Sequence, residues 1–111
     1  MHARAMAEGL KTHVVDANIA TYSSLLRSAD EATNPVWVEG IRLFRSLEPD
    51  SQKAFVAFMK NVAIDSVSSV LAIVDGVASL DEQDGEIVMT CGNDALSGSL
   101  QDEFLALFEE E

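Results

Sequence analysis

Hydrophobic side chains recur at helical spacing in the first quarter of the chain. The spacing predicts a helix over residues 15–28 with one apolar stripe toward the core. That stripe consists of Val15, Ile19, Tyr22 and Leu26. Residues 1–12 keep a poor helical register around Gly9, so we expect part of this segment to fray.

A second helix is predicted over residues 34–47, after the polar run 28–34. Asn34 can accept hydrogen bonds from free backbone donors at a helix start, and Pro35 is well tolerated in the first turn. The two residues together mark where the chain re-enters a helix.

The most apolar part of the chain predicts a long helix from Pro49 to Asp75, ending where Gly76 supplies a terminating conformation. Apolar residues occupy most of its circumference, which is typical of a central helix with other elements around it. Its longest apolar run, residues 62–74, is only 13 residues long. Because a bilayer requires about 20 such residues, we expect no transmembrane helix.

A narrow polar stripe follows the predicted long helix in steps of four, three, four and three. It consists of Asn61, Asp65, Ser68, Ala72 and Asp75. An ionised carboxylate is too costly to bury without partners, so two interpretations of Asp65 remain open. Either it faces solvent or nearby polar groups satisfy it, or Asp65 and Asp75 help to line a groove that a partner recognises.

Beyond Gly76 the pattern changes from helical to strand-like. Residues 81–85 predict a polar loop, residues 86–91 are rich in strand formers, and a short returning strand is expected near residues 95–97. From Ser99 a last helix is predicted, with the Ser99 side chain as its expected cap opposite Asp102. Its apolar face consists of Leu100, Phe104, Leu107 and Phe108.

The predicted fold class is therefore α+β and mostly α, with about four helices, one of them long and central, and a β-hairpin before the last helix. At 111 residues the chain fits a single domain spanning residues 1–111. Residues 109–111 are expected to form a solvated acidic tail, because a helix C-terminus disfavours negative charge.

The net charge of −12 belongs entirely to the second half of the chain. Residues 1–60 contain seven basic and seven acidic residues, whereas residues 61–111 contain twelve acids and neither Lys nor Arg. Such a surface repels phosphate groups, so we expect no binding to nucleic acid or to anionic membranes.

Few residues offer chemistry. Cys91 is the only cysteine, and a nucleophile there would need a base, yet His2 and His13 lie far away near the start of the sequence. The acidic segment 81–86 does not match the ligand spacing of a calcium loop. We expect no catalytic residue, cofactor or metal site. The single cysteine and the lack of a signal-like segment predict a cytoplasmic location.

The segments IDSVSSVLAIVDGV and LSGSLQDEFLALFEE, with the hairpin between them, resemble a small family of bacterial proteins without an assigned function. In that family a long apolar helix ending in Asp-Gly precedes a hairpin and a short Leu-Gln-Asp helix. The resemblance covers residues 49–110, implies an intracellular bacterial protein and transfers no catalytic residues. In size and charge alone, the chain is also similar to small acidic immunity proteins that neutralise toxins.

These observations favour a noncatalytic interaction module, immunity- or inhibitor-like, whose acidic C-terminal half binds a basic protein partner. The candidate partner-binding residues act by charge and are Asp65, Asp75, Asp81, Glu82, Asp84 and Glu86. The alternative is a structural or regulatory homo-oligomer, such as a homodimer, that buries the apolar helix across a two-fold interface. An enzyme ranks third and would require a concave site with convergent carboxylates.

Overall fold

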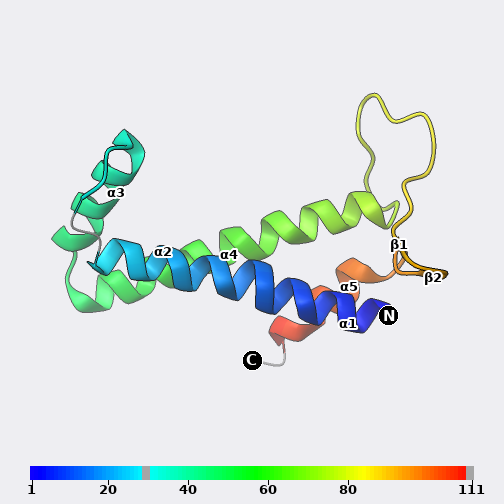
Figure 1. Cartoon of the computed structure of the whole chain (residues 1–111), viewed down its shortest axis with the longest axis horizontal. Helices are drawn as coiled ribbons and strands as arrows, with labels where there is room; N and C mark the ends of the chain where they lie inside the picture. Colours follow the sequence, from blue (N-terminus) through cyan, green and yellow to red (C-terminus); the bar gives the residue numbers. More distant parts are fainter. Residues whose placement is uncertain (29–30, 110–111) are drawn as a thin grey trace.

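The computed structural model describes residues 1–28 and 31–109, which form an elongated, mostly helical molecule measuring 48 × 34 × 22 Å (Figure 1). The order of elements is α1 (Ala3–Leu10), the π-helical η1 (Lys11–Asp16), α2 (Ala17–Ser28), α3 (Pro35–Ser46), α4 (Pro49–Val74), β1 (Thr90–Cys91), β2 (Asp94–Ala95) and α5 (Leu100–Glu109). The predicted mostly helical α+β class is confirmed, including the long helix and the antiparallel hairpin before the last helix.

The first helical rod begins much earlier than predicted. α1, η1 and α2 follow one another without a break in helical backbone, so residues 3–28 form one rod. The expectation that residues 1–12 fray is wrong, because Ala7 is fully buried and packs in the main core. Tertiary packing of this small side chain therefore outweighs the poor local pattern around Gly9.

The π-helical segment η1 lies where the rod meets α4 and α5. The Lys11 ammonium lies 3.1 Å from the Asp16 carboxylate, a pairing of residues i and i+5. Lys60 of α4 approaches the same carboxylate at 4.0 Å. Both ammonium groups also lie over the Phe108 ring, at 5.5 and 5.7 Å from its centre. This cluster joins three elements through one aspartate and one aromatic ring.

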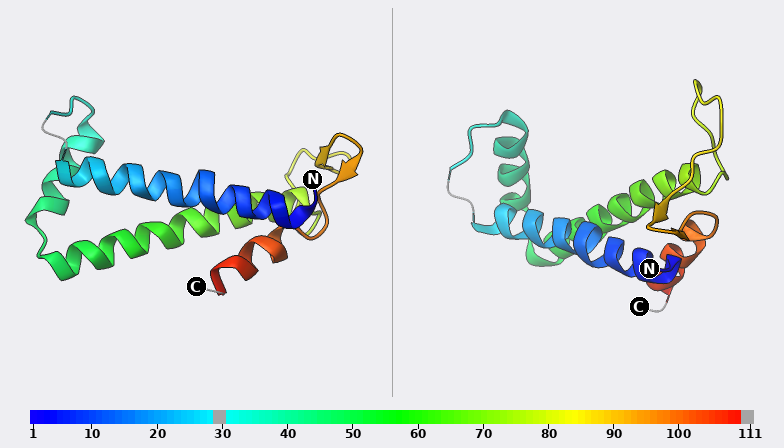
Figure 2. Two further views of the ribbon diagram at one scale, coloured as in Figure 1. Left: turned by 60° about the horizontal axis from the view of Figure 1, so that its bottom comes forward. Right: turned by 45° about the vertical axis from the view of Figure 1, so that its right-hand side comes forward.

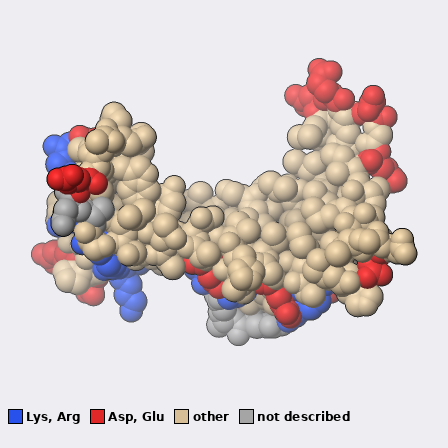
Figure 3. All heavy atoms as spheres, viewed as in Figure 1, with Lys and Arg blue, Asp and Glu red and all other residues tan. Residues whose placement is uncertain are grey.

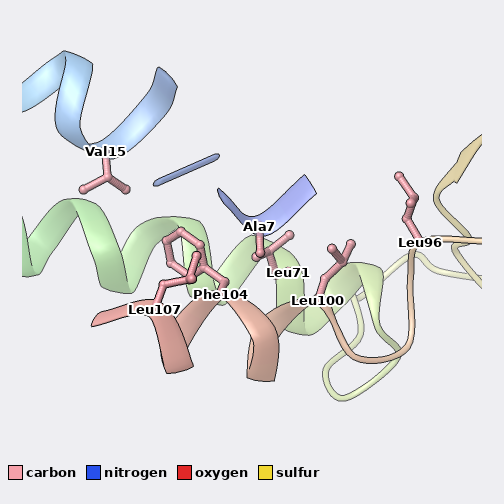
Figure 4. Close-up of a cluster of buried hydrophobic side chains, with 7 residues drawn as sticks. All are labelled: Ala7, Val15, Leu71, Leu96, Leu100, Phe104 and Leu107. Atoms are coloured by element: carbon pink, nitrogen blue, oxygen red, sulfur yellow. The ribbon is translucent and has the colours of Figure 1, made fainter. Parts of the chain in front are cut away.

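The main core lies at the end of the molecule where α1, the end of α4 and α5 meet (Figure 4). Its buried members are Ala7, Val15, Leu71, Leu96, Leu100, Phe104 and Leu107. The predicted apolar face of the last helix is confirmed, since Leu100, Phe104 and Leu107 are buried and the Phe108 ring packs edge-on against Phe104.

A second, smaller core lies at the opposite end, where α3 meets α2 and the start of α4. Leu26, Ile41 and Phe44 are buried there, with the Phe55 ring against Phe44. The predicted start of α3 is confirmed, because the Asn34 side chain accepts hydrogen bonds from the backbone N–H groups of residues 36 and 37. Residues 29 and 30 of the predicted polar run lie outside the described residues.

The long helix α4 ends as predicted, but it is not surrounded by other elements. Gly76 follows its C-cap with φ +81°, a conformation that favours glycine. Phe58 is 72% exposed, Val62 55% and Val70 58%. The long helix of the predicted fold is present and contacts both the rod and α5. α5 covers only its end and the rod runs along one side, so much of its circumference stays exposed (Figure 2).

The hairpin is shorter than predicted. Only Thr90–Cys91 and Asp94–Ala95 pair as strands, whereas residues 86–89 approach the hairpin as irregular chain. Pairing continues briefly through the Met89 carbonyl, which accepts hydrogen bonds from the N–H groups of Leu96 and Ser97. The strand propensity of residues 86–91 is overridden because no further strand is present in the described residues to receive them.

The start of the chain is held against the hairpin. The Met1 ammonium donates a hydrogen bond to the Asp94 carboxylate at 2.8 Å, although both groups are exposed. This hydrogen bond and the attraction of the two charges raise the pKa of the amino group above its ordinary value of 8.0. The tail predicted at residues 109–111 is helical at Glu109, and residues 110 and 111 lie outside the described residues.

The Met1–Asp94 contact predicts a local effect of pH. A pKa raised in the folded chain means that the contact contributes fully below pH 8.0 and is lost as pH rises through the folded pKa. NMR titration should therefore show the amide signals of residues 91–95 shifting above pH 8. In Asp94→Asn the amine should titrate near about 7.7–8.0. An unchanged amine pKa in this variant would contradict the contact.

The two phenylalanines at opposite extremes of burial test the core. Phe104→Ala should lower the free energy of unfolding by about 3–5 kcal/mol, because it leaves a cavity among fully buried side chains. The matched change Phe58→Ala removes a ring that is 72% exposed and should cost no more than about 0.5 kcal/mol. Urea unfolding followed by circular dichroism measures both free energies of unfolding. Equal decreases in the two variants would contradict the assignment of Phe104 to the main core.

Candidate interaction surface

Asp75 connects the end of α4 to the beginning of α5. One carboxylate oxygen accepts a hydrogen bond from the Gly98 N–H at 2.7 Å, and the other accepts from the Gln101 N–H at 2.8 Å. These donors belong to the first turn of α5 and to the approach to it, where backbone N–H groups have no partner within the helix. Asp75 thus serves as the side-chain acceptor at this helix start, a role that the sequence had suggested for Ser99.

The C-terminal half of the polar stripe faces α5. Ser68 is buried, and its hydroxyl accepts a hydrogen bond from the Gln101 side chain at 3.0 Å. The same Gln101 amide also lies 3.3 Å from the Ser68 carbonyl, and Ala72 is buried beside them. The small and polar side chains therefore allow α5 to approach α4 closely, and this part of the stripe is a contact between helices.

The N-terminal half of the stripe faces outward. Asn61 and Asp65 are both exposed, so Asp65 does not need a buried partner. Of the two interpretations left open by the sequence, solvent exposure holds for Asp65. The proposed pair of Asp65 and Asp75 is not formed as one site, because ten residues of α4 separate them and Asp75 is engaged by α5.

The other four candidate acids lie together on the loop between α4 and the hairpin. Asp81, Glu82, Asp84 and Glu86 are all exposed, and the loop stands away from the helices (Figures 1 and 3). The Gln83 side chain organises the loop, since its oxygen accepts from the Leu80 N–H and its amide donates to the Gly85 carbonyl. Glu86 and Asp75 both line a hollow of about 360 Å³ at the base of this loop.

An apolar groove between α2 and α4 was not predicted from the sequence. Two adjoining hollows of about 290 and 190 Å³ share Tyr22 and Met59 in their walls. The first also has Ile19, Val62 and Ala63, and the second extends to Val36, Trp37 and Gly40 of α3. The groove thus runs along the two long helices and ends at α3.

Tyr22 is the residue that the sequence pattern assigned wrongly. Its side chain is 45% exposed rather than buried with Val15 and Leu26, and its ring lies 4.8 Å from that of Trp37. The helical spacing is correct, but α4 diverges from α2 at this point and leaves the stripe uncovered. A partly exposed pair of large aromatic rings is typical of protein interfaces.

The groove forms the bottom of a saddle-shaped face. α3 rises at one end of the long helices and the acidic loop rises at the other, in Figure 1 and in both views of Figure 2. The second hollow includes Val36, Trp37 and Gly40, so α3 forms one wall of the groove. In Figure 3 the charged side chains gather at the ends and underside, and the concave part between them is uncharged.

We call the apolar part of this face the apolar floor; three of its five side chains are exposed, and Ile19 and Met59 are half-buried. Val70 belongs to it because it follows Met59 by eleven residues, about three helical turns, and so lies on the same side of α4. Asp65 lies about 60° around the helix from Val62 and so flanks the floor on that side, whereas Ser66 lies between Val62 and Val70. The apolar floor consists of Ile19, Tyr22, Met59, Val62 and Val70.

By length and composition alone, α4 is apolar enough to cross a membrane, with 17% of the tested window buried. The expectation drawn from residues 62–74 considered too short a segment, since the helix extends to Pro49. The core helix of a soluble protein passes the same criterion. A core helix is mostly buried, whereas most of α4 is not. The question is therefore what the apolar side chains on its exposed side contact.

The remaining polar groups do not converge on one point. Cys91 is exposed on β1, so it does not pack as an apolar strand residue. Within residues 1–28 and 31–109, no group of three His, Cys, Asp or Glu side chains is placed to hold a metal ion. The expectations of no enzyme activity, no cofactor and no metal stay predictions.

Comparison with protein-family models, curated proteins and solved structures finds no match to the chain. The resemblance of residues 49–110 to a bacterial family therefore stays a prediction, as does the analogy with immunity proteins. The fold class is established by the helices and hairpin described above.

The two aspartates of α4 predict opposite mutational effects. Asp75→Ala should lower the free energy of unfolding by about 0.5–2 kcal/mol, because the start of α5 loses its acceptor. Asp75→Asn should cost less because it retains one oxygen acceptor. Asp65→Ala, the matched control on an exposed site, should stay within about 0.5 kcal/mol. Urea unfolding measures all three, and equal effects at both positions would contradict the structural role of Asp75.

Proposed function

We propose that this chain is a noncatalytic protein-interaction module. The observation that carries the proposal is the apolar floor, an open face with exposed aromatic and aliphatic side chains. Contiguous exposed apolar surface of this kind marks interaction sites in soluble proteins. A groove between two helices that ends at a third is also the geometry that accepts an apolar segment of a partner.

The acidic loop supports the predicted preference for a basic protein partner. Its four carboxylates project from the molecule, and the sequence from residue 61 onward contains no Lys or Arg to neutralise them. Charged groups at the rim of an interface mainly guide encounter and select partners, whereas apolar contacts supply most of the affinity. The proposal therefore assigns affinity to the apolar floor and selectivity to Asp81, Glu82, Asp84 and Glu86.

Asp65 and Asp75 have lesser parts in the proposal. Asp65 is exposed at the edge of the apolar floor and contributes charge there, and Asp75 holds α5 in place. A cytoplasmic location and an immunity- or inhibitor-like role remain compatible with such a module and belong to the proposal. No nucleic acid is invoked, because the acidic half repels phosphates.

Photo-crosslinking tests whether the apolar floor contacts protein. A benzophenone amino acid placed at Tyr22 should give a discrete protein adduct in cells that produce the chain, and Val62→Asp should abolish it. The same amino acid at Ala20, exposed on the far side of α2, is the matched control. Absence of any adduct from position 22, or equal adducts from both positions, would refute the interaction function.

Paired charge variants test the role of the loop with a lysine-rich peptide as the cationic probe. Asp81→Asn with Glu82→Gln should weaken binding by up to about fivefold for each exposed ion pair lost. The control Asp65→Asn with Asp102→Asn removes the same charge elsewhere and should weaken it less. Binding measured by fluorescence anisotropy should also weaken as salt rises. An equal loss of peptide affinity in the two double variants would contradict a specific role of the loop carboxylates in binding.

A further inference from the structure

The described chain exposes more surface than a compact protein of its size. Its accessible surface is 7505 Å². A monomer of 12.0 kDa is expected to expose about 6,000 Å². The Cα radius of gyration is 17.2 Å, against about 13 Å for a compact chain of this length. The excess of about 1,500 Å² measures how far the elements fail to cover one another.

From this excess and from the shape of the saddle, we propose that the apolar floor is covered by a second copy of the chain, in an antiparallel two-fold dimer. The proposal rests on the interaction function above and assigns the apolar floor to a second copy in place of the basic protein partner proposed there. The excess belongs to the whole elongated molecule, and a two-fold interface that removed all of it from both copies would total about 3,000 Å², against about 2,000–5,000 Å² for obligate homodimers.

The shape of the molecule makes the face complementary to itself. α3 and the acidic loop rise from the same side at opposite ends, with the long helices between them (Figure 2). Two such faces can pack against each other about a two-fold axis perpendicular to the long helices, so that the long axes of the two copies run in opposite directions. α3 of each copy then lies beside the loop of the other, and the two floors face each other. Both contacts form twice, as an isologous interface requires.

Charge selects this orientation over the parallel one. A parallel two-fold arrangement would bring the two loops together, each with four exposed carboxylates. The antiparallel arrangement instead keeps the two loops at opposite ends of the dimer, each beside α3, where exposed Arg42 is paired with Glu39. Like charges placed opposite each other across an interface are strongly unfavourable, so the loops exclude the parallel dimer.

The loop also carries apolar side chains that gain from the same contact. Val77 is 73% exposed, and Leu80 and Val88 are exposed on the same loop. Exposed Val36 stands at the opposite end of the saddle, where α3 borders the groove. The antiparallel dimer brings these two sets of apolar side chains together and removes both from water.

A bilayer fits the uncovered helix less well than a second copy does. Asp65 lies near the middle of α4 and is exposed, with Asn61, Ser66 and Ser69 also exposed nearby. A carboxylate at the centre of a bilayer costs about 2.5–3.5 kcal/mol even on scales that allow it to adapt. In the antiparallel dimer Asp65 lies beside Val62 at the edge of the interface, where its carboxylate keeps its water.

Sedimentation velocity of the purified chain provides the first test. The native chain should be dimeric at tens of micromolar, and Val62→Asp or Val70→Asp should weaken the dimer by at least about tenfold by burying an unpaired charge. Ala20→Asp, with the same change of charge on the far side of α2, should stay dimeric. Circular dichroism should show all variants folded. A native monomer at high micromolar concentration, or equal weakening by Ala20→Asp, would overturn the proposal.

Salt distinguishes a second copy from a basic partner. Each copy carries −12, so raising salt from low to physiological strength should strengthen self-association by screening the repulsion between copies. Binding to a basic protein would weaken instead. A monomeric chain that still gives an adduct to another protein at position 22 would overturn the dimer and leave the interaction function standing. Flotation of the chain with phosphatidylcholine vesicles would likewise overturn the dimer.

Mixed cysteine variants test the orientation in a Cys91→Ser background. Leu80→Cys chains and Val36→Cys chains are combined and treated with a short bis-maleimide. The antiparallel dimer predicts that linked pairs contain one chain of each kind. Pairs linked between two Leu80→Cys chains, or random linkage in all combinations, would contradict the antiparallel arrangement.

Discussion

The structure depends on the carboxylate of Asp75, which accepts hydrogen bonds from two backbone N–H groups at the start of α5. Through it, the end of α4 fixes where α5 begins, and α5 then supplies Leu100, Phe104 and Leu107 to the main core. α1 packs on the same core through Ala7. One end of the molecule is thereby closed. Because α5 is only ten residues long, it cannot reach the rest of α4, and the other half of that helix depends on contacts with α2 and α3 alone.

This division explains why so apolar a helix remains uncovered. The rod and α4 meet closely near η1, where Asp16 and two lysines join them, and α3 closes the far end with a small second core. Between these two points the side chains of Tyr22, Met59 and Val62 line a groove in place of a core. The apolar floor is thus a consequence of the number and length of the elements, and the acids of the protruding loop limit what can approach it.

Local signals in the sequence were sufficient for most of the fold. The cap at Asn34, the stop at Gly76 and the apolar face of α5 depend on neighbouring residues, and the structure has all three. What depends on contacts between distant segments was predicted less well. Residues 3–10 form a helix whose Ala7 is buried in the core with α5, and Tyr22 is exposed because the two long helices diverge. The candidate acids could not be sorted from the sequence for the same reason. Only the three-dimensional structure shows that Asp75 binds the start of α5, whereas Asp65 and the acids of the loop are exposed.

The central claim is that the apolar floor of one copy contacts a second copy. Isotope-filtered NMR on an equal mixture of ¹³C-labelled and unlabelled chains measures this contact directly. The account predicts intermolecular NOEs from the methyl groups of Val62 and Val70 to protons of the unlabelled copy, together with NOEs between Val36 and the loop methyl groups. Intermolecular NOEs confined to other surfaces, or none at a concentration where the chain is fully folded, would contradict it.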